Sequence, residues 1–80
     1  MKFNLNGLGT KDIKTFIPTK LTEVEEIIAY LKNNPLILNV SKLKGNKTQR
    51  ILDILLGACL LLNKGICPLD KHNYLLLDKN

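Results

Sequence analysis

The feature that most constrains this sequence is a segment near Asn46–Asn63 that reads as a helix and is apolar on more than one side. At about 100° per residue, one set of apolar side chains forms a face that can cover a sheet. This face comprises Ile51, Ile54, Leu55, Ala58, Leu61 and Leu62. The adjoining side is apolar as well, with Leu52, Leu56, Cys59 and Leu60. A helix that is apolar nearly all round is a buried helix.

A chain of 80 residues forms one small domain, which cannot easily cover both sides of such a helix. The missing cover is most simply another protein chain, so the pattern predicts a homodimer or a higher polymer. Gly57 lies on the narrow polar strip of the helix, where close approach of another backbone would explain it. Arg50 and Asp53 lie on the same strip and can pair with each other or reach a partner. The alternative is an ordinary surface ion pair beside a tolerated glycine.

The remaining segments predict an α/β two-layer sandwich with the order strand, helix, strand, helix, strand, strand. The first strand falls within Lys11–Lys20 and ends at Pro18, and residues 1–12 form a loose lead-in to a core of residues 13–80. A helix spans Thr22–Asn33, where Thr22 and Glu25 have capping-box spacing. The mixed sheet is expected to be covered by the two helices.

The other strands follow from short apolar runs between turn signals. Leu36–Val40 reads as a buried strand near the centre of the sheet. Ile66–Leu69 and Tyr74–Leu77 read as a hairpin joined by Asp70–Asn73, and Pro68 assigns the first of them to an edge. The long helix is expected to begin at an Asn46 cap, with Gln49 at capping-box spacing, and to end at Lys64-Gly65.

The composition predicts a cytoplasmic domain, and the sequence contains no recognisable catalytic motif. Two cysteines without a disulfide pattern, and no signal peptide, indicate a reducing compartment. His72, the one histidine, does not have metal-ligand spacing with Cys59 or Cys67. The Gly7–Lys11 segment does not match a phosphate loop. The sequence therefore predicts a protein that is not an enzyme, with no catalytic residue, metal or cofactor.

The net charge of +5 raises nucleic-acid binding as an alternative. The element order is also similar to small nucleic-acid-binding α/β modules, and a basic run precedes and enters the long helix at Lys42, Lys44, Lys47 and Arg50. No aromatic side chains interleave with these residues, so a solvated lysine surface is favoured over nucleic-acid binding. A structural oligomer without further partners is a third hypothesis.

The segment TQRILDILLGA resembles the signature of the SepF family of cell-division proteins, which has a basic pair, two aliphatics, Asp-Phe, two small or aliphatic residues and Gly. Gln49–Gly57 occupies that pattern, with Ile54 in place of the usual Phe and Gln49 in place of a basic residue. The preceding segments EIIAYLKNN and LILNV also fall where the family has matching elements. The resemblance covers Ile13–Asn80.

The resemblance implies a dimeric division protein, located at the division site, that binds the C-terminal tail of FtsZ and can polymerise. Carried over by position, Gln49, Arg50 and Ile54 are expected to bind the tail. Self-association is expected to involve Leu52, Asp53, Leu56, Gly57 and Leu60. Family members usually begin with an amphipathic membrane-targeting helix, and Met1–Thr10 does not match one, so the sequence argues against membrane binding.

Overall fold

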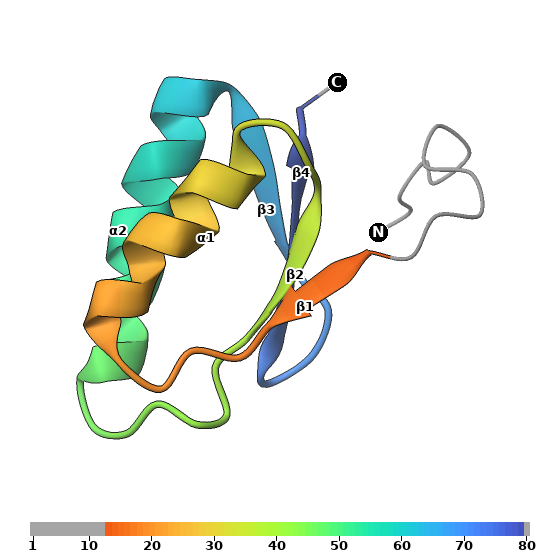
Figure 1. Ribbon diagram of the computed structural model, residues 1–80. Helices are drawn as coiled ribbons and strands as arrows, with labels where there is room; N and C mark the ends of the chain where they lie inside the picture. The colour runs from red at the N-terminus through yellow and green to blue at the C-terminus, as the bar shows by residue number, and fades with distance from the viewer. Residues whose placement is uncertain (1–12, 80) are drawn as a thin grey trace.

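Two helices pack on one face of a four-stranded sheet in the computed structural model of the protein, which describes residues 13–79 (Figure 1). In chain order the elements are β1 (Lys14–Phe16), the 3-10 helix η2 (Leu21–Glu23), α1 (Val24–Leu31), β2 (Leu36–Asn39), α2 (Lys47–Leu62), β3 (Lys64–Pro68) and β4 (Asn73–Asp78). The predicted α/β two-layer architecture and element order are confirmed. The predicted lead-in, residues 1–12, lies outside the described residues.

The sheet is mixed and has the strand order β1-β2-β4-β3. β1 runs parallel to β2, with Thr15 opposite Ile37, whereas β4 is antiparallel to both of its neighbours. β2 therefore lies inside the sheet, as its apolar run predicts. β3 lies at an edge of the described sheet, which agrees with the position of Pro68 at its end.

The core lies between the sheet and the two helices. In β2, Leu36 and Leu38 are buried while Ile37 and Asn39 are only partly covered, because successive strand side chains point to opposite faces. Apart from Pro18, which precedes η2, the large side chains that are fully covered come from both helices and the two inner strands: Ile27, Leu31, Leu36, Leu38, Ile51, Leu55 and Leu76. This set shows that α1 and α2 both seal the same face of the sheet.

The start of the first helix differs from the prediction. No capping box forms between Thr22 and Glu25, so that prediction is wrong. The Glu23 carboxylate accepts hydrogen bonds from the backbone N–H of Thr19 at 2.7 Å and of Lys20 at 2.9 Å. The 3-10 turn η2 precedes α1, and this turn moves the capping role to Glu23. The bonds from Thr19 and then Lys20 lower the pKa of the Glu23 carboxyl below its ordinary value.

The ends of α2 also correct the prediction. Asn46 has helical backbone angles and makes no side-chain cap, and Gln49 turns instead to Asp53. The helix ends at Asn63, which adopts the left-handed conformation with φ of 57°. Asparagine tolerates this conformation better than most residues. Lys64 therefore begins β3 and does not belong to the end of the helix.

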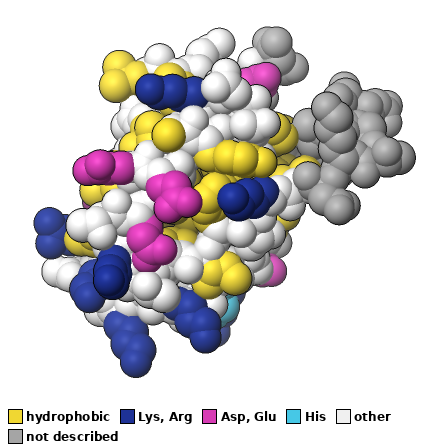
Figure 2. Space-filling view, in the orientation of Figure 1, with side chains coloured by type: hydrophobic (Ala, Val, Ile, Leu, Met, Phe, Trp, Pro, Cys, Tyr) yellow, Lys and Arg dark blue, Asp and Glu magenta, His cyan; other side chains and the backbone are white. Residues whose placement is uncertain are grey.

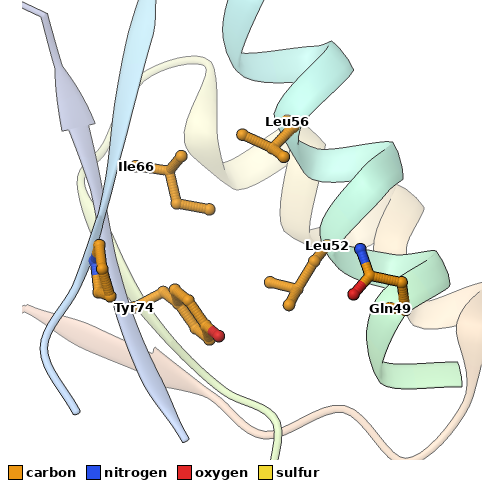
Figure 3. Close-up of a pocket in the computed structure, with 6 residues that line it drawn as sticks. Gln49, Leu52, Leu56, Ile66 and Tyr74 are labelled. Atoms are coloured by element: carbon orange, nitrogen blue, oxygen red, sulfur yellow. The ribbon is translucent and has the colours of Figure 1, made fainter. Parts of the chain in front are cut away.

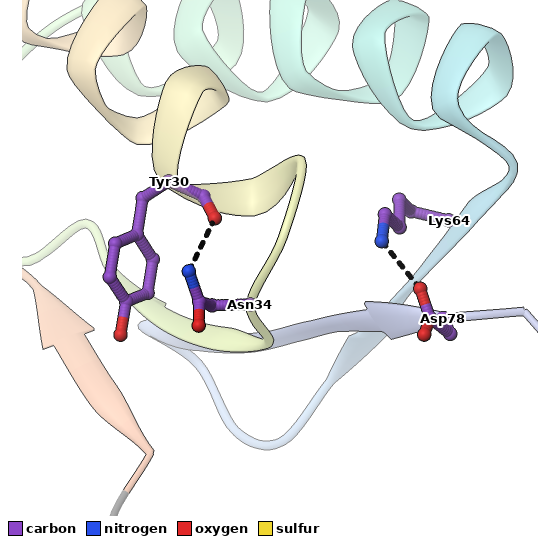
Figure 4. Close-up of polar contacts among 4 residues, drawn as sticks. All are labelled: Tyr30, Asn34, Lys64 and Asp78. Atoms are coloured by element: carbon purple, nitrogen blue, oxygen red, sulfur yellow. Dashed lines mark hydrogen bonds and ion pairs between the residues drawn. The ribbon is translucent and has the colours of Figure 1, made fainter.

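The last two strands form the predicted hairpin. The Asp70 carboxylate accepts hydrogen bonds from the backbone N–H of His72 at 2.9 Å and of Asn73 at 3.0 Å. These bonds, the one from His72 first, lower the pKa of Asp70 and fix the turn. At the far end of the hairpin, Lys64 forms an ion pair with Asp78 (Figure 4). The same view shows Asn34 donating to the carbonyl oxygen of Tyr30 after α1, at 3.3 Å.

Candidate functional site

The buried stripe of α2 is narrower than the predicted face and is rotated from it. Ile51, Leu55 and Cys59 are buried, so Cys59 belongs to the core. Ile54 and Leu61, predicted to cover the sheet, are 43% and 89% exposed. Periodicity alone gives relative angles around the helix. The actual rotation is set by contacts with α1 on one flank and with β3 on the other.

A cavity of about 160 Å³ lies between α2 and the β3–β4 hairpin. Its walls are almost entirely apolar: α2 contributes Gln49, Leu52 and Leu56, and the hairpin contributes Ile66, Pro68 and Tyr74. Figure 3 shows the side chains of Leu52 and Leu56 directed from the helix toward Tyr74 and Ile66 on the strands. The cavity can therefore accept apolar side chains of a bound molecule.

A second cavity of about 390 Å³ continues along the same side of the helix. Leu56 and Ile66 line both cavities, so the two adjoin along α2 and β3, and together they are here called the α2–β3 groove. The second cavity is further lined by Cys59, Leu60, Lys64, Gly65, Cys67 and Lys79. The groove thus runs from Gln49 and Pro68 at one end to Lys64 and Lys79 at the other.

Polar contacts at the rim of the groove differ from the predicted ones. Gln49 donates from Nε2 to Oδ1 of Asp53 at 2.8 Å. Among residues 13–79 the one ion pair is between Lys64 and Asp78, so the predicted pair between Arg50 and Asp53 is not formed. The Arg50 side chain is exposed and remains available to a partner.

The structure divides the predicted FtsZ-tail residues between two sides of α2. Gln49 lines the α2–β3 groove, whereas Arg50 and Ile54 are exposed and do not line it. The angles of Arg50 and Ile54 on the helix place them on the flank opposite Leu56. The structure therefore does not bring the three residues together into one pocket.

The predicted self-association residues are divided as well. Leu52, Leu56 and Leu60 line the groove, and Asp53 and Gly57 lie exposed on the outer surface of α2. A Cβ atom added at Gly57 would meet nothing within 4 Å, so no contact inside the subunit requires a glycine there. A separate exposed apolar patch is formed by Ile54 and Leu61.

Three lining residues of the first cavity, Ile66, Pro68 and Tyr74, were not predicted as site residues. Each was recognised only as part of a strand. Two features of the sequence together indicate a groove: an edge strand, and a helix that has more apolar residues than its core-facing side needs. Because that combination depends on which strand lies beside which flank of α2, the sequence alone could not assign these residues to the groove.

The chemically reactive side chains within the described residues show no arrangement for catalysis. Burial raises the pKa of the Cys59 thiol, so its reactive thiolate form is disfavoured. His72 is exposed on the hairpin turn. Within residues 13–79 no group of three His, Cys, Asp or Glu side chains could hold a metal ion. None of the helices in this part of the chain has the length and apolar character needed to span a membrane.

The basic run proposed for nucleic acid lies around the β2–α2 connection. Lys42, Lys44, Lys47 and Arg50 are all exposed there. In Figure 2, basic side chains gather at the lower end of the face shown, while acidic side chains lie over α1. The two signs of charge therefore share this face, which gives a mixed surface in place of a uniform basic one.

A comparison of the sequence with protein-family models matches the cell division protein SepF over residues 13–77. The match spans both helices, all four strands of the described sheet except the last residue of β4, and every residue that lines the first cavity. No curated protein matches the sequence. Because the family match covers most of the chain, this protein belongs to the SepF family of cell-division proteins.

Proposed function

We propose that this chain is a cell-division adaptor that binds the C-terminal tail of FtsZ in the α2–β3 groove and self-associates, acting in the cytoplasm at the division site. The observation that carries the proposal is the continuous apolar groove beside the family's signature helix. A groove of this kind suits a short segment with apolar anchors, because burying one Leu or Phe side chain contributes about 1.5–3 kcal/mol. Gln49 at one end supplies a polar contact.

Self-association is supported by apolar side chains on the outer surface of α2 that the subunit does not cover. Leu61 is 89% exposed and Ile54 is 43% exposed, and their spacing of seven residues places them on the same side of the helix. Gly57 lies between these apolar side chains with open space above it, which permits close approach of a second backbone. We therefore propose that the outer surface of α2 contacts another subunit.

Titration of a labelled FtsZ C-terminal peptide against the protein tests tail binding. Leu56→Asp places a charge in the wall shared by both cavities, and we expect affinity to fall by about tenfold or more. Ile17→Asp is the control, since it introduces the same charge at a 51% exposed apolar residue next to β1, at the opposite edge of the sheet from the groove. Absence of peptide binding at high micromolar protein would contradict the proposal.

The same titration decides the roles of Arg50 and Ile54. Arg50→Ala and Ile54→Asp weaken binding if the tail extends across the outer surface of α2. Unchanged affinity in both variants, together with loss in Leu56→Asp, confines the tail to the groove. The two results therefore distinguish a tail that lies in the groove from one that spans the helix.

Light scattering tests self-association. We expect a dimer or larger species at micromolar concentration, and a lower mass for Leu61→Asp and Gly57→Lys, which place charges where a second subunit would pack. Circular dichroism of both variants checks that the helices remain folded. A monomer at all accessible concentrations would contradict the proposed contact.

A further inference from the structure

The hydrogen-bonding direction of each β3 residue follows from contacts at both ends of the hairpin. The Leu69 N–H donates to the Asn73 carbonyl at 2.8 Å, and the Lys79 N–H donates to the Asn63 carbonyl at 3.4 Å. In an antiparallel pair, hydrogen-bonded and non-hydrogen-bonded positions alternate. Counting inward from both ends, Gly65 and Cys67 direct their backbone groups toward β4.

The pairing of β4 with β2 gives the same result independently. The Val40 N–H donates to the His72 carbonyl at 2.9 Å, which fixes the alternation along that pair. Tyr74 and Leu76 then face β2, so Leu75 and Leu77 are left to face β3. Their register partners are Cys67 and Gly65, in agreement with the count from the hairpin ends.

The backbone groups of Lys64, Ile66 and Pro68 consequently point away from the sheet. No other strand among residues 13–79 pairs with this side of β3. Pro68 has no N–H, so its place in the outward set removes no bond from the β3–β4 ladder. The unpaired N–H groups of Lys64 and Ile66, with the carbonyls of all three residues, form a row that another extended chain can match.

This row lies along the α2–β3 groove. Ile66 lines both cavities of the groove, and Leu56 and Leu60 face it from α2 with 46% and 76% of their surface exposed. A strand added beside β3 would lie about 4.8 Å away and place every second side chain on the groove side. Those side chains would cover Leu56 and Leu60, which the subunit leaves exposed.

We propose that a peptide binds the α2–β3 groove as an extra antiparallel strand on β3, and that its groove-facing side chains are apolar. The proposal rests on the proposed function in taking the FtsZ tail as that peptide. The residue opposite Ile66 exchanges both N–H···O bonds with it and shares its face of the sheet. Every second residue of the peptide therefore both hydrogen-bonds to the β3 backbone and directs its apolar side chain into the groove.

The charges at the end of the groove indicate the polar part of the peptide. Lys64 is paired with Asp78, whereas Lys79 lines the second cavity and its side chain is exposed. An acidic residue next to the apolar ones would meet Lys79. The fitting ligand is thus an extended segment with alternating apolar residues and a carboxylate at the Lys79 end.

Amide hydrogen exchange by NMR on the full chain, with and without saturating FtsZ tail peptide, tests the added strand. We expect exchange of the Lys64 and Ile66 amides to slow by about tenfold or more on binding. The Gly65 and Cys67 amides already bond to β4 and serve as internal controls with little change. Peptide binding that leaves Lys64 and Ile66 unprotected overturns the added strand but leaves tail binding intact, whereas no binding overturns both.

A set of peptides with single N-methylated amides provides the second measurement. We expect affinity to fall by about tenfold at every second position, and the same positions to reject polar side chains. Sensitivity without this two-residue period overturns the proposal. Concentration-dependent protection of the Lys64 and Ile66 amides in the free protein overturns it as well, because a second copy then occupies the edge.

Discussion

The two helices lie on the same face of one sheet, yet they use their apolar residues differently. α1 buries Val24, Ile27 and Leu31 and exposes Glu25 and Glu26, so its apolar surface matches what the core needs. α2 is twice as long, 16 residues against 8, and buries the same number of side chains. It leaves Leu56, Leu60 and Leu61 exposed. The fold therefore covers most of the apolar surface of α1 but only part of that of α2.

Truncating buried residues should affect both helices alike. Ile27→Ala in α1 and Leu55→Ala in α2 each remove a side chain that is at most 1% exposed, and we expect a loss of about 2–5 kcal/mol in the free energy of unfolding. Leu61→Ala, at 89% exposure, should change it by no more than about 0.5 kcal/mol. Denaturant unfolding at low protein concentration measures all three. A large loss from Leu61→Ala in a monomer would show that the fold itself needs the outer surface of α2.

Substituting the glycine of α2 separates folding from association. Gly57→Ala should raise the free energy of unfolding of the monomer by about 1 kcal/mol, because alanine favours the helix and its Cβ meets open space. If a second subunit packs against Gly57, the same change should weaken the dimer in sedimentation equilibrium. A gain in monomer stability with unchanged association would place the subunit contact elsewhere.

The starts of the helices differ in pH dependence. The pKa of the Glu23 carboxyl is lower in the folded protein than its ordinary value of 4.5, so its contribution to stability is present above pH 4.5 and is lost as the pH falls below that value through the lowered pKa. Glu23→Gln should lower the melting temperature at pH 7, and the two proteins should converge once the pH lies below the lowered pKa of the folded Glu23 carboxyl. Asn46→Ala is the control at the start of α2, where no side-chain cap exists, and should have a smaller effect. A Glu23→Gln difference that is constant with pH would contradict this role.

The fold could be predicted from the sequence where a local pattern decides the structure. The apolar run of Leu36–Val40 and the turn formers at Asp70–Asn73 each indicate one outcome, a buried strand and a hairpin turn, and the structure has both. The helix ends could not be predicted, because several polar residues compete for the same backbone groups. The chain forms a 3-10 turn before α1, and in this turn Glu23, in place of Thr22, accepts the hydrogen bonds of the free backbone N–H groups.

The candidate site was predictable only in part for a different reason. The excess of apolar residues on α2 is visible from spacing alone, and Leu52, Leu56 and Leu60 do lie at the groove. The division of α2 into a groove flank and an outer flank depends on β3 being the neighbouring edge strand. Helical spacing separates Gln49 from Ile54, but which of the two flanks borders β3 follows only from the three-dimensional arrangement.

Asn63 is the only residue between the last turn of α2 and the first residue of β3. The two walls of the groove are consequently joined at an apex, and their separation at Lys64 is set by one left-handed residue. A tilt of α2 about that point would displace the Gln49 end most and leave the Lys64 end nearly unchanged. The larger cavity, of about 390 Å³, lies at the Lys64 end, where the backbone holds the two walls together, so this end is the preformed part of the groove and sets the position of whatever binds.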